Sequence, residues 1–295
     1  MSYMDMDQLY KNRDIMLFRE AYALEKIHGT SAHIIWKSPI VEGWKEGKVS
    51  LFPGGSDYPS FSALFNLEDL KAKFTERFLD RDVVIYGEVY GGKMMDMSDT
   101  YGPKLKFIVF EVKIGEHSFL NVPHAEKVAL EFGLEFVPYE KISTDIASLD
   151  AERDAPSIQA IRNGMGYDKK REGIVLRPLI EVRKNNGQRV ISKHKAEDFK
   201  ETKTPRKLDA EKLAILSKAE DIAEEWATPM RLVHVLDKFP ITAGMEQLGE
   251  IIVAMIKDIE KEAGGEVENF KEARKAIGKK TAEMFKERFK SGLQP

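Results

Sequence analysis

The sequence predicts a mixed α+β domain with mostly antiparallel sheet over residues 1–203, followed by an all-helical domain over residues 204–295. Two observations predict this division. Up to about residue 200, short runs rich in Val, Ile, Phe and Tyr alternate with Gly, Pro and Asn, as antiparallel strands and their turns do. Beyond that point strand patterns are absent, and apolar residues recur at spacings of three and four, which is typical of one face of a helix.

The strands of the first domain are expected where β-branched and aromatic residues cluster, at 32–35, 48–52, 83–90, 105–113, 173–182 and 189–193. Helices are expected between them at 67–79, 125–132 and 158–162. The turn Asn185-Asn186-Gly187 separates the last two strands and indicates a hairpin.

In the second domain, residues 202–206 predict a linker, and breaks at 242–244 and 264–265 separate the helices. Three apolar helix faces are expected. They are formed by Leu213, Leu216, Ala219, Ile222, Ala223 and Trp226, by Leu248, Ile251, Ile252, Met255 and Ile259, and by Phe270, Ala273 and Ile277.

The composition excludes several classes of protein. A chain of 295 residues with 42% hydrophobic residues is apolar enough for about two packed domains. No run approaches the roughly 18 apolar residues of a membrane span, and the first residues lack the basic start and apolar stretch of a signal peptide. The absence of cysteine excludes disulfides, thiolate metal sites and cysteine nucleophiles. We expect a monomeric cytoplasmic protein with no membrane partner.

The net charge is −3, so any contact with a polyanion must come from a local patch. The stretch from 184 to 207 contains three acids and eight basic residues that could face phosphates. The basic residues are Lys184, Arg189, Lys193, Lys195, Lys200, Lys203, Arg206 and Lys207. The alternative is a solvated charged hairpin and linker.

The chemistry is predicted to centre on the short loop Glu25-Lys26-Ile27-His28-Gly29-Thr30. A lysine becomes a covalent nucleophile when desolvation or a neighbouring cation lowers the pKa of its ammonium group. Glycine beside it lets a phosphate approach the backbone closely. Because a lone lysine in a loop is usually a solvated surface charge, the role of Lys26 depends on three later stretches.

These later stretches supply the groups that such a nucleophile needs. Glu88 ends one predicted strand and Glu172 begins another, where carboxylates can hold sugar hydroxyls or a hydrated Mg²⁺. Lys193 and Lys195 alternate along a strand and so point to one face, where two ammonium groups suit the charge on a phosphorus under attack. The set predicts nucleotidyl transfer through a lysine phosphoramidate.

Each piece also has an ordinary explanation. Glu88 could be an exposed turn residue, and Lys193 and Lys195 could be edge-strand charges that prevent aggregation. Their joint occurrence, in this order along the chain, favours the functional interpretation.

With these motifs in order, the first 200 residues or so resemble the covalent nucleotidyltransferases, the superfamily of DNA ligases, RNA ligases and mRNA-capping enzymes. The signature of DNA ligases and capping enzymes is lysine-x-Asp-Gly, and here His28 stands in place of the aspartate. That form is similar to the ATP-dependent, nick-sealing RNA ligase 2 family. The resemblance implies an ATP-grasp-like nucleotidyltransferase domain of antiparallel sheets with helices, followed by the helical domain.

The resemblance implies roles for the residues of the loop. Lys26 resembles the lysine that attacks the α-phosphate of ATP and holds AMP. Glu25 resembles the residue that reads the adenine edge, and Ile27 belongs to the same nucleotide-binding motif. His28 would assist the later RNA steps, and its alternative is a hydrogen-bonded structural histidine.

Further roles fall on the later strands. Glu88 resembles the acid on the ribose and in the water shell of the Mg²⁺ or Mn²⁺ ion, and Glu172 resembles the second metal-binding acid. Phe110 resembles the aromatic that stacks on adenine, although Glu111 replaces the usual aspartate after it and Phe107 is a nearby candidate. Lys193 and Lys195 resemble the pair that contacts the α-phosphate.

One departure from the family pattern concerns an arginine that usually follows the nucleophile motif at the end of the next strand. Between Lys26 and Arg77 the sequence has no arginine, and the corresponding stretch is 50–56. The glycine turn in it, at Pro53-Gly54-Gly55, offers backbone N–H groups that we expect to cradle a phosphate instead.

The resemblance implies an ATP-dependent RNA ligase that joins RNA 3′-hydroxyl and 5′-phosphate ends through lysyl-AMP and an adenylylated end, in RNA repair. Its partners would be RNA ends, including a nicked duplex. One alternative is a lysine-adenylylating ligase for DNA or DNA/RNA hybrids, or a capping enzyme, but those append a β-barrel domain rather than helices. The other is a non-catalytic nucleic-acid-binding accessory protein, against which Lys26, Glu88 and Glu172 are all present.

Overall fold

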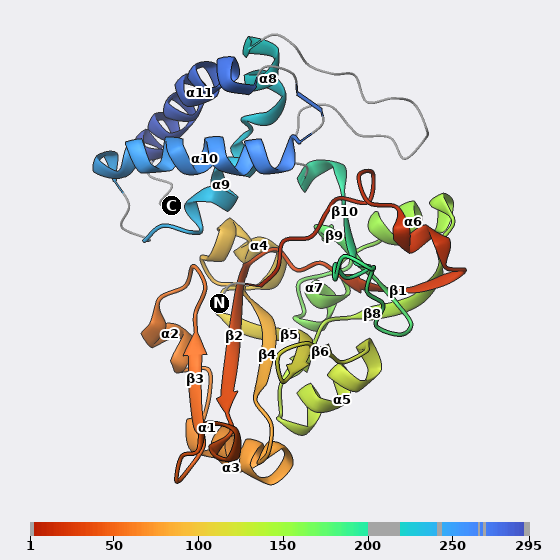
Figure 1. Ribbon diagram of the computed structural model, residues 1–295. Helices are drawn as coiled ribbons and strands as arrows, with labels where there is room; N and C mark the ends of the chain where they lie inside the picture. The colour runs from red at the N-terminus through yellow and green to blue at the C-terminus, as the bar shows by residue number, and fades with distance from the viewer. Residues whose placement is uncertain (1–2, 200–218, 241–243, 265, 268–269, 292–295) are drawn as a thin grey trace. The chain divides into compact units, whose positions relative to one another are not determined.

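The computed structural model describes residues 3–199, 219–240, 244–264, 266–267 and 270–291 (Figure 1). Its contacts divide the chain into two compact units, residues 1–196 and 197–295, each with its own core. Several predicted features lie outside the described residues. These are the linker at 202–206, the boundary after residue 203, the breaks at 242–243 and 265, and residues Lys200, Lys203, Arg206, Lys207, Leu213 and Leu216.

Two sheets form the first unit, and their mostly antiparallel strands confirm the predicted α+β class. The four-stranded sheet has the order β10-β9-β1-β8, with β1 at Glu20–Glu25, β8 at Tyr139–Ser143, β9 at Gly173–Pro178 and β10 at Ser192–Lys195. The six-stranded sheet has the order β3-β2-β4-β5-β6, with β7 pairing parallel to β5. Its strands are β2 at Thr30–Lys37, β3 at Lys48–Phe52, β4 at Val83–Tyr90, β5 at Lys106–Ile114, β6 at Ser118–Phe119 and β7 at Glu135–Phe136.

Every α-helix of the first unit except α4 begins at a side chain that caps it. Asn66, Asn121 and Ser157 each accept a hydrogen bond from a backbone amide of the helix that follows. The α-helices are α1 at Pro39–Glu42, α2 at Tyr58–Ser62, α3 at Leu67–Phe78, α4 at Ser98–Tyr101, α5 at Val122–Glu131, α6 at Ile146–Arg153 and α7 at Ile158–Arg162, and 3-10 turns occupy Asp14–Leu17 and Met94–Asp96.

The predicted elements match these bounds to different degrees. β3, β4 and α7 occupy the predicted residues, whereas β9 stops at Pro178 because proline has no amide to donate to a ladder. The predicted hairpin turn is present, since Arg183 and Arg189 pair across it and Gly187 has a φ of 82°. β8 is absent from the predicted strands because the exposed residues Glu140 and Lys141 interrupt its apolar pattern. β1 is absent because its run Ala21-Tyr22-Ala23-Leu24 is short and contains two alanines, which are depleted in strands.

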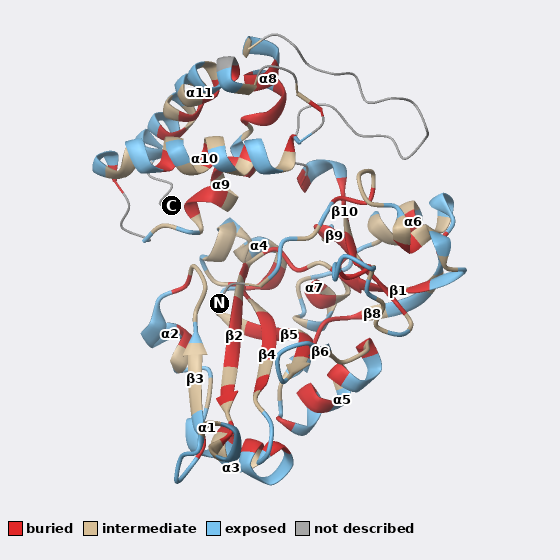
Figure 2. Ribbon diagram, in the orientation of Figure 1, coloured by how far each residue is buried: buried red, intermediate tan, exposed pale blue. Residues whose placement is uncertain are grey.

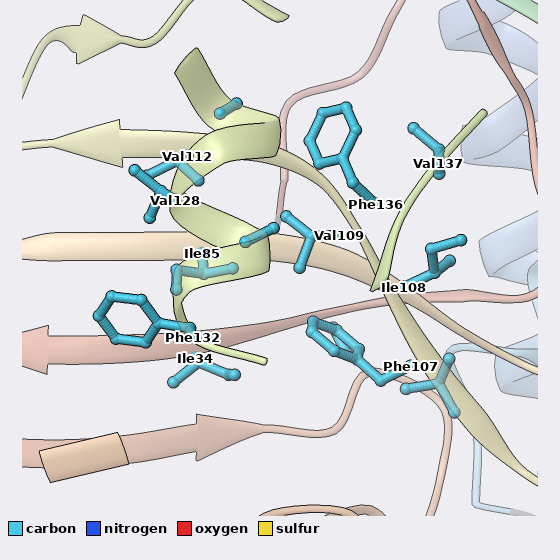
Figure 3. Close-up of a cluster of buried hydrophobic side chains, with 14 of the residues drawn as sticks. Ile34, Ile85, Phe107, Ile108, Val109, Val112, Val128, Phe132, Phe136 and Val137 are labelled. Carbon is cyan, nitrogen blue, oxygen red and sulfur yellow. The ribbon is translucent and has the colours of Figure 1, made fainter. Parts of the chain in front are cut away.

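The core of the first unit is densest between the six-stranded sheet and the helices that cover one of its faces. Ile34, Ile85 and Val109 of the sheet pack with Val128 and Phe132 of α5 (Figure 3). The central strands β2, β4 and β5 are largely buried along their length (Figure 2). This packing makes the sheet a rigid support for residues on its other face.

The second unit is helical over the residues that the structure describes. Its α-helices are α8 at Ala219–Trp226, α9 at Pro229–Leu236, α10 at Leu248–Glu262 and α11 at Phe270–Lys290, with 3-10 turns at Glu197–Phe199 and Met245–Gln247. Ile251, Met255 and Ile259 of α10 are fully buried, which confirms the predicted apolar face. Within the described residues, none of the helices combines the length and the apolar character needed to cross a membrane.

Candidate active site

The predicted nucleophile lies on the loop that joins the two sheets. β1 of the four-stranded sheet ends at Glu25, and β2 of the six-stranded sheet begins at Thr30. The backbone amide of Lys26 donates to the carbonyl oxygen of Gly173 at 3.0 Å, which fastens the loop to the start of β9. The side chain of Lys26 is 20% exposed, so its amine can be reached from solvent although its surroundings are buried.

Glu88 lies beside this loop. On β4 it pairs with Ser31 of β2, and a Cβ added at Gly29 would lie 3.1 Å from the Cγ atom of Glu88. The same Cβ would lie 2.1 Å from the carbonyl oxygen of Val89, so only glycine lets the loop pass this close to β4. The structure thus places the Glu88 carboxylate next to the nucleophile motif.

Glu172 gathers the basic groups of the site. The Nζ atom of Lys26 lies 2.8 Å from its Oε2 atom, and the Nδ1 atom of His28 lies 3.2 Å from the same oxygen. The Nζ atom of Lys195 lies 3.0 Å from Oε1. The side chain of Glu172 has no exposed surface, so these contacts take the place of water.

The environment of Glu172 keeps it ionised. Burial raises the pKa of its carboxyl group, but the charges of Lys26 and Lys195 and the hydrogen bond from His28 outweigh burial. The pKa of Glu172 is therefore held well below its usual range. A permanent buried anion fixes the position of two lysines that would otherwise repel each other.

The other lysine of β10, Lys193, has a different environment. The amide of Lys193 donates to the carbonyl of Asp7 at 2.9 Å, and its carbonyl accepts from the amide of Leu9 at 2.8 Å. The N-terminal segment thus pairs with the strand that carries both lysines. The structure brings Lys195, through Glu172, to the nucleophile, whereas the backbone of Lys193 anchors the N-terminal segment.

Glu25 is bound to the start of α7. Its carboxylate accepts hydrogen bonds from the hydroxyl of Ser157 at 2.5 Å and from the amides of Ile158 and Gln159 at 2.9 and 3.1 Å. Burial raises the pKa of Glu25, and these hydrogen bonds oppose that shift. Glu25 is nearly fully buried, and its predicted role in reading the adenine edge stays a prediction.

Ile27 and His28 point away from solvent. The side chain of Ile27 packs in the core, so a nucleotide contact at this position would involve its backbone. His28 is also buried, and its amide donates to the hydroxyl of Tyr101 at 3.3 Å while its ring contacts Glu172. These contacts match the structural alternative for His28, and its predicted role in the RNA steps stays a prediction.

The two aromatic candidates for adenine stacking occupy different places. Phe110 lies at an irregularity in the pairing of β4 with β5, and its ring contacts that of Tyr3 at 4.9 Å. Phe107 lies in the core, where its ring contacts those of Phe61 and Phe65 at 5.6 and 5.4 Å. Neither ring has a described contact with Lys26 or Glu172, so the assignment to Phe110 stays a prediction.

The glycine turn after β3 differs from its predicted use. The amide of Gly55 donates to the Oγ1 atom of Thr30 at 2.8 Å, and the amide of Ser56 donates to the carbonyl of Pro53 at 3.2 Å. The expectation that this turn cradles a phosphate is wrong for these two amides, because both are already bonded. The turn instead fastens the end of β3 to the start of β2.

A second buried glutamate, Glu111, is the centre of a charge cluster that was not predicted from the sequence. Glu111 of β5 has no exposed surface and accepts hydrogen bonds from Arg189 at 2.8 and 2.5 Å and from the hydroxyl of Tyr3 at 2.6 Å. The Nη1 atom of Arg177 lies 2.9 Å from it. A lone acid within the apolar run 106–114 was a signal that buried cations must lie nearby.

The cluster at Glu111 also corrects the predicted basic patch. Arg189 and Lys195 do not face solvent, since both are buried and bound to glutamates. Lys184 forms an ion pair with Asp14. The hairpin turns two of its basic side chains inward, so the described part of this run does not form an exposed cationic surface.

Comparison with known proteins identifies the family. The family model described as RNA ligase matches residues 19–195, which include the loop of Lys26, Glu88, Glu172 and both β10 lysines. The chain belongs to the RNA ligase family. The match covers more than half of the chain and coincides with the two-sheet unit.

Solved structures of an RNA ligase from Naegleria gruberi are similar to this family member at low identity. The structure with pyrophosphate has a TM-score of 0.47 and 14% identity, and the match covers 68% of this chain and 57% of that chain. A point mutant solved with AMP and Mn has a TM-score of 0.46 and 14% identity over the same shares. The chain thus spans a little over half the length of these ligases. Comparison with curated proteins gives no match.

Proposed function

We propose that this chain is an ATP-dependent RNA ligase that joins a 3′-hydroxyl and a 5′-phosphate through a lysyl-AMP intermediate on Lys26. The observation that supports it is the arrangement in which Glu172 contacts Lys26, Lys195 and His28 at 2.8–3.2 Å. The family match supports the reaction class. The nick-sealing type of substrate and a role in RNA repair are part of the proposal.

In the first step the Nζ atom of Lys26 attacks the α-phosphorus of ATP. A phosphorus–nitrogen bond forms, the bond to the β-phosphate oxygen breaks, and pyrophosphate leaves with its electron pair. The ammonium of Lys26 gives up two protons to solvent, which its partly exposed side chain reaches, so the phosphoramidate nitrogen keeps one N–H and carries no positive charge. Lys195 remains charged beside Glu172 and is placed to stabilise the charge that develops on the α-phosphate.

In the second step an oxygen of the RNA 5′-phosphate attacks the AMP phosphorus, and the bond to Lys26 breaks. The released nitrogen takes up two protons from solvent, and the resulting ammonium regains its contact with Glu172, which stabilises its charge. In the third step the RNA 3′-oxygen attacks the activated 5′-phosphorus. AMP leaves and a phosphodiester bond remains.

A divalent cation fits the carboxylate of Glu88 better than that of Glu172. Mg²⁺ and Mn²⁺ prefer oxygen ligands, and Glu88 is a partly exposed carboxylate beside the nucleophile loop. Both oxygens of Glu172 already contact basic side chains. A metal ion bound at Glu88 would neutralise charge on the phosphates of the nucleotide. We assign its water shell to Glu88, while a direct role of Glu172 would compete with its lysines.

The test is incubation with ATP or GTP labelled in the α-phosphate, with Mg²⁺, followed by denaturing electrophoresis. The wild-type chain should carry label from ATP alone. Lys26→Ala should carry none, whereas Lys127→Ala, at an exposed position of α5, should label like wild type. Label that persists on Lys26→Ala, or no label from either nucleotide on folded protein free of bound AMP, would exclude the mechanism. Sealing assays with RNA and DNA ends then separate the RNA ligase from the DNA ligase alternative.

A further inference from the structure

A row of aromatic rings crosses the face of the six-stranded sheet that carries Glu88. Phe52 of β3 stacks on His33 of β2, with ring centroids 4.6 Å apart and an interplanar angle of 21°. His33 contacts Tyr86 of β4 at 5.4 Å, and Tyr3 covers Tyr86 at 5.1 Å. The three rings line up because His33 is directly opposite both Phe52 and Tyr86 in the strand pairing.

Only one end of this row is open. His33 is 1% exposed and Tyr86 is 5% exposed, whereas Phe52 is 38% exposed. Among the described residues, β3 is the edge strand of its sheet, and no described strand flanks it on the side away from β2 (Figure 1). The ring therefore has one face held by His33 and another available to a flat partner.

The support beneath Phe52 is uncharged at neutral pH. Burial lowers the pKa of His33 to about 4, so its ring is a neutral imidazole. Stacked neutral rings suit a partner that is itself flat and aromatic. Nucleobases stack on exposed aromatic side chains in this way, whatever their sequence.

The row lies one step away from the proposed active site. Ser31 pairs with Glu88 beside the nucleophile loop, and His33 is two residues farther along β2 on the same face. Two residues of a strand span about 7 Å, comparable to the extent of one nucleotide. The bond from Gly55 to Thr30 fixes the end of β3 against the start of β2, which fixes Phe52 relative to the loop.

The same face carries a cation that suits a nucleic acid. Lys113 of β5 is opposite Val84 of β4, so it lies toward the Tyr86 end of the row, with β2 and β4 between its strand and that of Phe52. Its charge acts on His33. Over the part of the chain that the structure describes, Lys113 makes no ion pair. A partly exposed lysine on the face that carries Phe52 can contact a phosphate of a nucleotide chain whose base reaches that ring.

We propose that Phe52, supported by His33, is a stacking site for the nucleobase next to the join in the RNA substrate. This inference rests on the proposed function and adds the residue that holds the substrate end. Phe52 ends β3 within the stretch 50–56, which lacks the arginine that the family pattern leads one to expect. Stacking would replace a phosphate contact there.

The experiment compares Phe52→Leu, which keeps an apolar side chain without an aromatic face, with Phe52→Trp, which enlarges that face. Trp44→Leu is the matched control, because Trp44 is 47% exposed just before the opposite end of β3. Affinity is measured by fluorescence anisotropy with labelled nicked RNA duplexes. In two further duplexes the nucleotide on the 5′-phosphate side or the 3′-hydroxyl side of the nick lacks its base.

Phe52→Leu should bind intact RNA roughly 5- to 100-fold more weakly, and Phe52→Trp should bind at least as tightly as wild type. Wild type should lose a similar factor on one of the two abasic duplexes, which identifies the side, and Phe52→Leu should not distinguish that duplex from intact RNA. All variants should attach AMP at the wild-type rate.

The inference is overturned if Phe52→Leu binds intact RNA like wild type, or if Trp44→Leu weakens binding equally. It is also overturned if wild type binds both abasic duplexes as tightly as intact RNA. Absence of AMP attachment in wild type would instead contradict the proposed function. The anisotropy series would still decide whether Phe52 contacts a base.

Discussion

Two buried glutamates of the first unit each hold a cluster of cations, but the cations differ in chemistry. Glu172 contacts Lys26 and Lys195, and one of those lysines remains partly exposed. Glu111 is held by two arginines, of which Arg189 makes a forked contact through both terminal nitrogens. Neither glutamate has exposed surface, so burial alone does not distinguish the two clusters.

The difference lies in whether a cation can give up its charge. An amine can lose its proton and form a covalent bond, whereas a guanidinium stays protonated in proteins. Burial lowers the pKa of Arg189, but hydrogen bonds to Glu111 and Glu181 outweigh burial and raise it above its usual value. The cluster at Glu111 therefore joins two sheets permanently. The cluster at Glu172 holds a charge that chemistry can remove.

The largest expected effect is on the rate of AMP attachment, which should depend on Glu172 and not on Glu111. Glu172→Gln should slow AMP attachment to Lys26 by about 10²- to 10³-fold, because the anion that positions both lysines is lost. Glu111→Gln should attach AMP close to the wild-type rate per folded molecule. Rates of labelling from ATP, normalised to folded protein by circular dichroism, measure both. Equal losses in the two variants would show that the clusters do not differ in function.

Substitution in the cluster at Glu111 should instead lower the stability of the fold. Arg189→Met leaves Glu111 with one fewer buried cation and should lower the free energy of unfolding by about 3–5 kcal/mol. Lys184→Met removes a partly exposed ion pair with Asp14 and should cost less than about 1 kcal/mol. Urea denaturation of each variant gives both values. A loss for Arg189→Met as small as that for Lys184→Met would mean that the buried network contributes little.

The response to acid should identify the depressed carboxyl group. Since the pKa of folded Glu172 is below its unfolded value near 4.5, ionisation of this group stabilises the fold above that pH. The stabilisation is lost as the pH falls from about 4.5 toward the folded pKa, by at most about 1.4 kcal/mol per pH unit. The free energies of unfolding of wild type and Glu172→Gln, measured against pH, should therefore converge at pH values below the folded pKa of Glu172. A constant difference between the two curves would contradict the shift.

A smaller effect is expected at the N-terminal contact of the arginine cluster. Tyr3→Phe removes the hydroxyl that donates to Glu111 but keeps the ring contacts with Tyr86 and Phe110. The free energy of unfolding should fall by about 1.5 kcal/mol, the usual contribution of a hydrogen bond to a charged group. Tyr3→Leu should cost more because the ring contacts are lost as well. Identical values for the two variants would assign the whole contribution to the hydroxyl.

The sequence was informative where chemistry fixes residue type and order. Lys26, Glu172 and Lys195 were predicted to share one site. In the structure the Nζ atoms of Lys26 and Lys195 lie 2.8 and 3.0 Å from the carboxylate oxygens of Glu172. β9 and part of β10 could be located from their local runs of apolar residues, whereas β1, which leads into Lys26, was not predicted. β3 and β4 needed no tertiary information for the same reason.

The sequence was uninformative where a partner is set by tertiary structure. Glu25 caps α7 although Ser157 is 132 positions away, and capping rules consider only residues next to a helix. Arg189 belongs to a basic run in sequence, but the pairing of β9 with β10 and the docking of Tyr3 direct it inward to Glu111. Residue type alone does not separate a buried arginine from a solvated one.

The distance along the chain between the two halves of the site has a consequence for synthesis. Lys26 and Glu172 are 146 positions apart, and β10, which supplies Lys195, is the last strand of its unit. The N-terminal segment also pairs with that strand, through the bridge between Gln8 and Lys193. A nascent chain therefore carries its nucleophile through the synthesis of the next 146 residues before the carboxylate that positions it is made. Prematurely terminated chains that end before β10 contain Lys26 but cannot assemble the site.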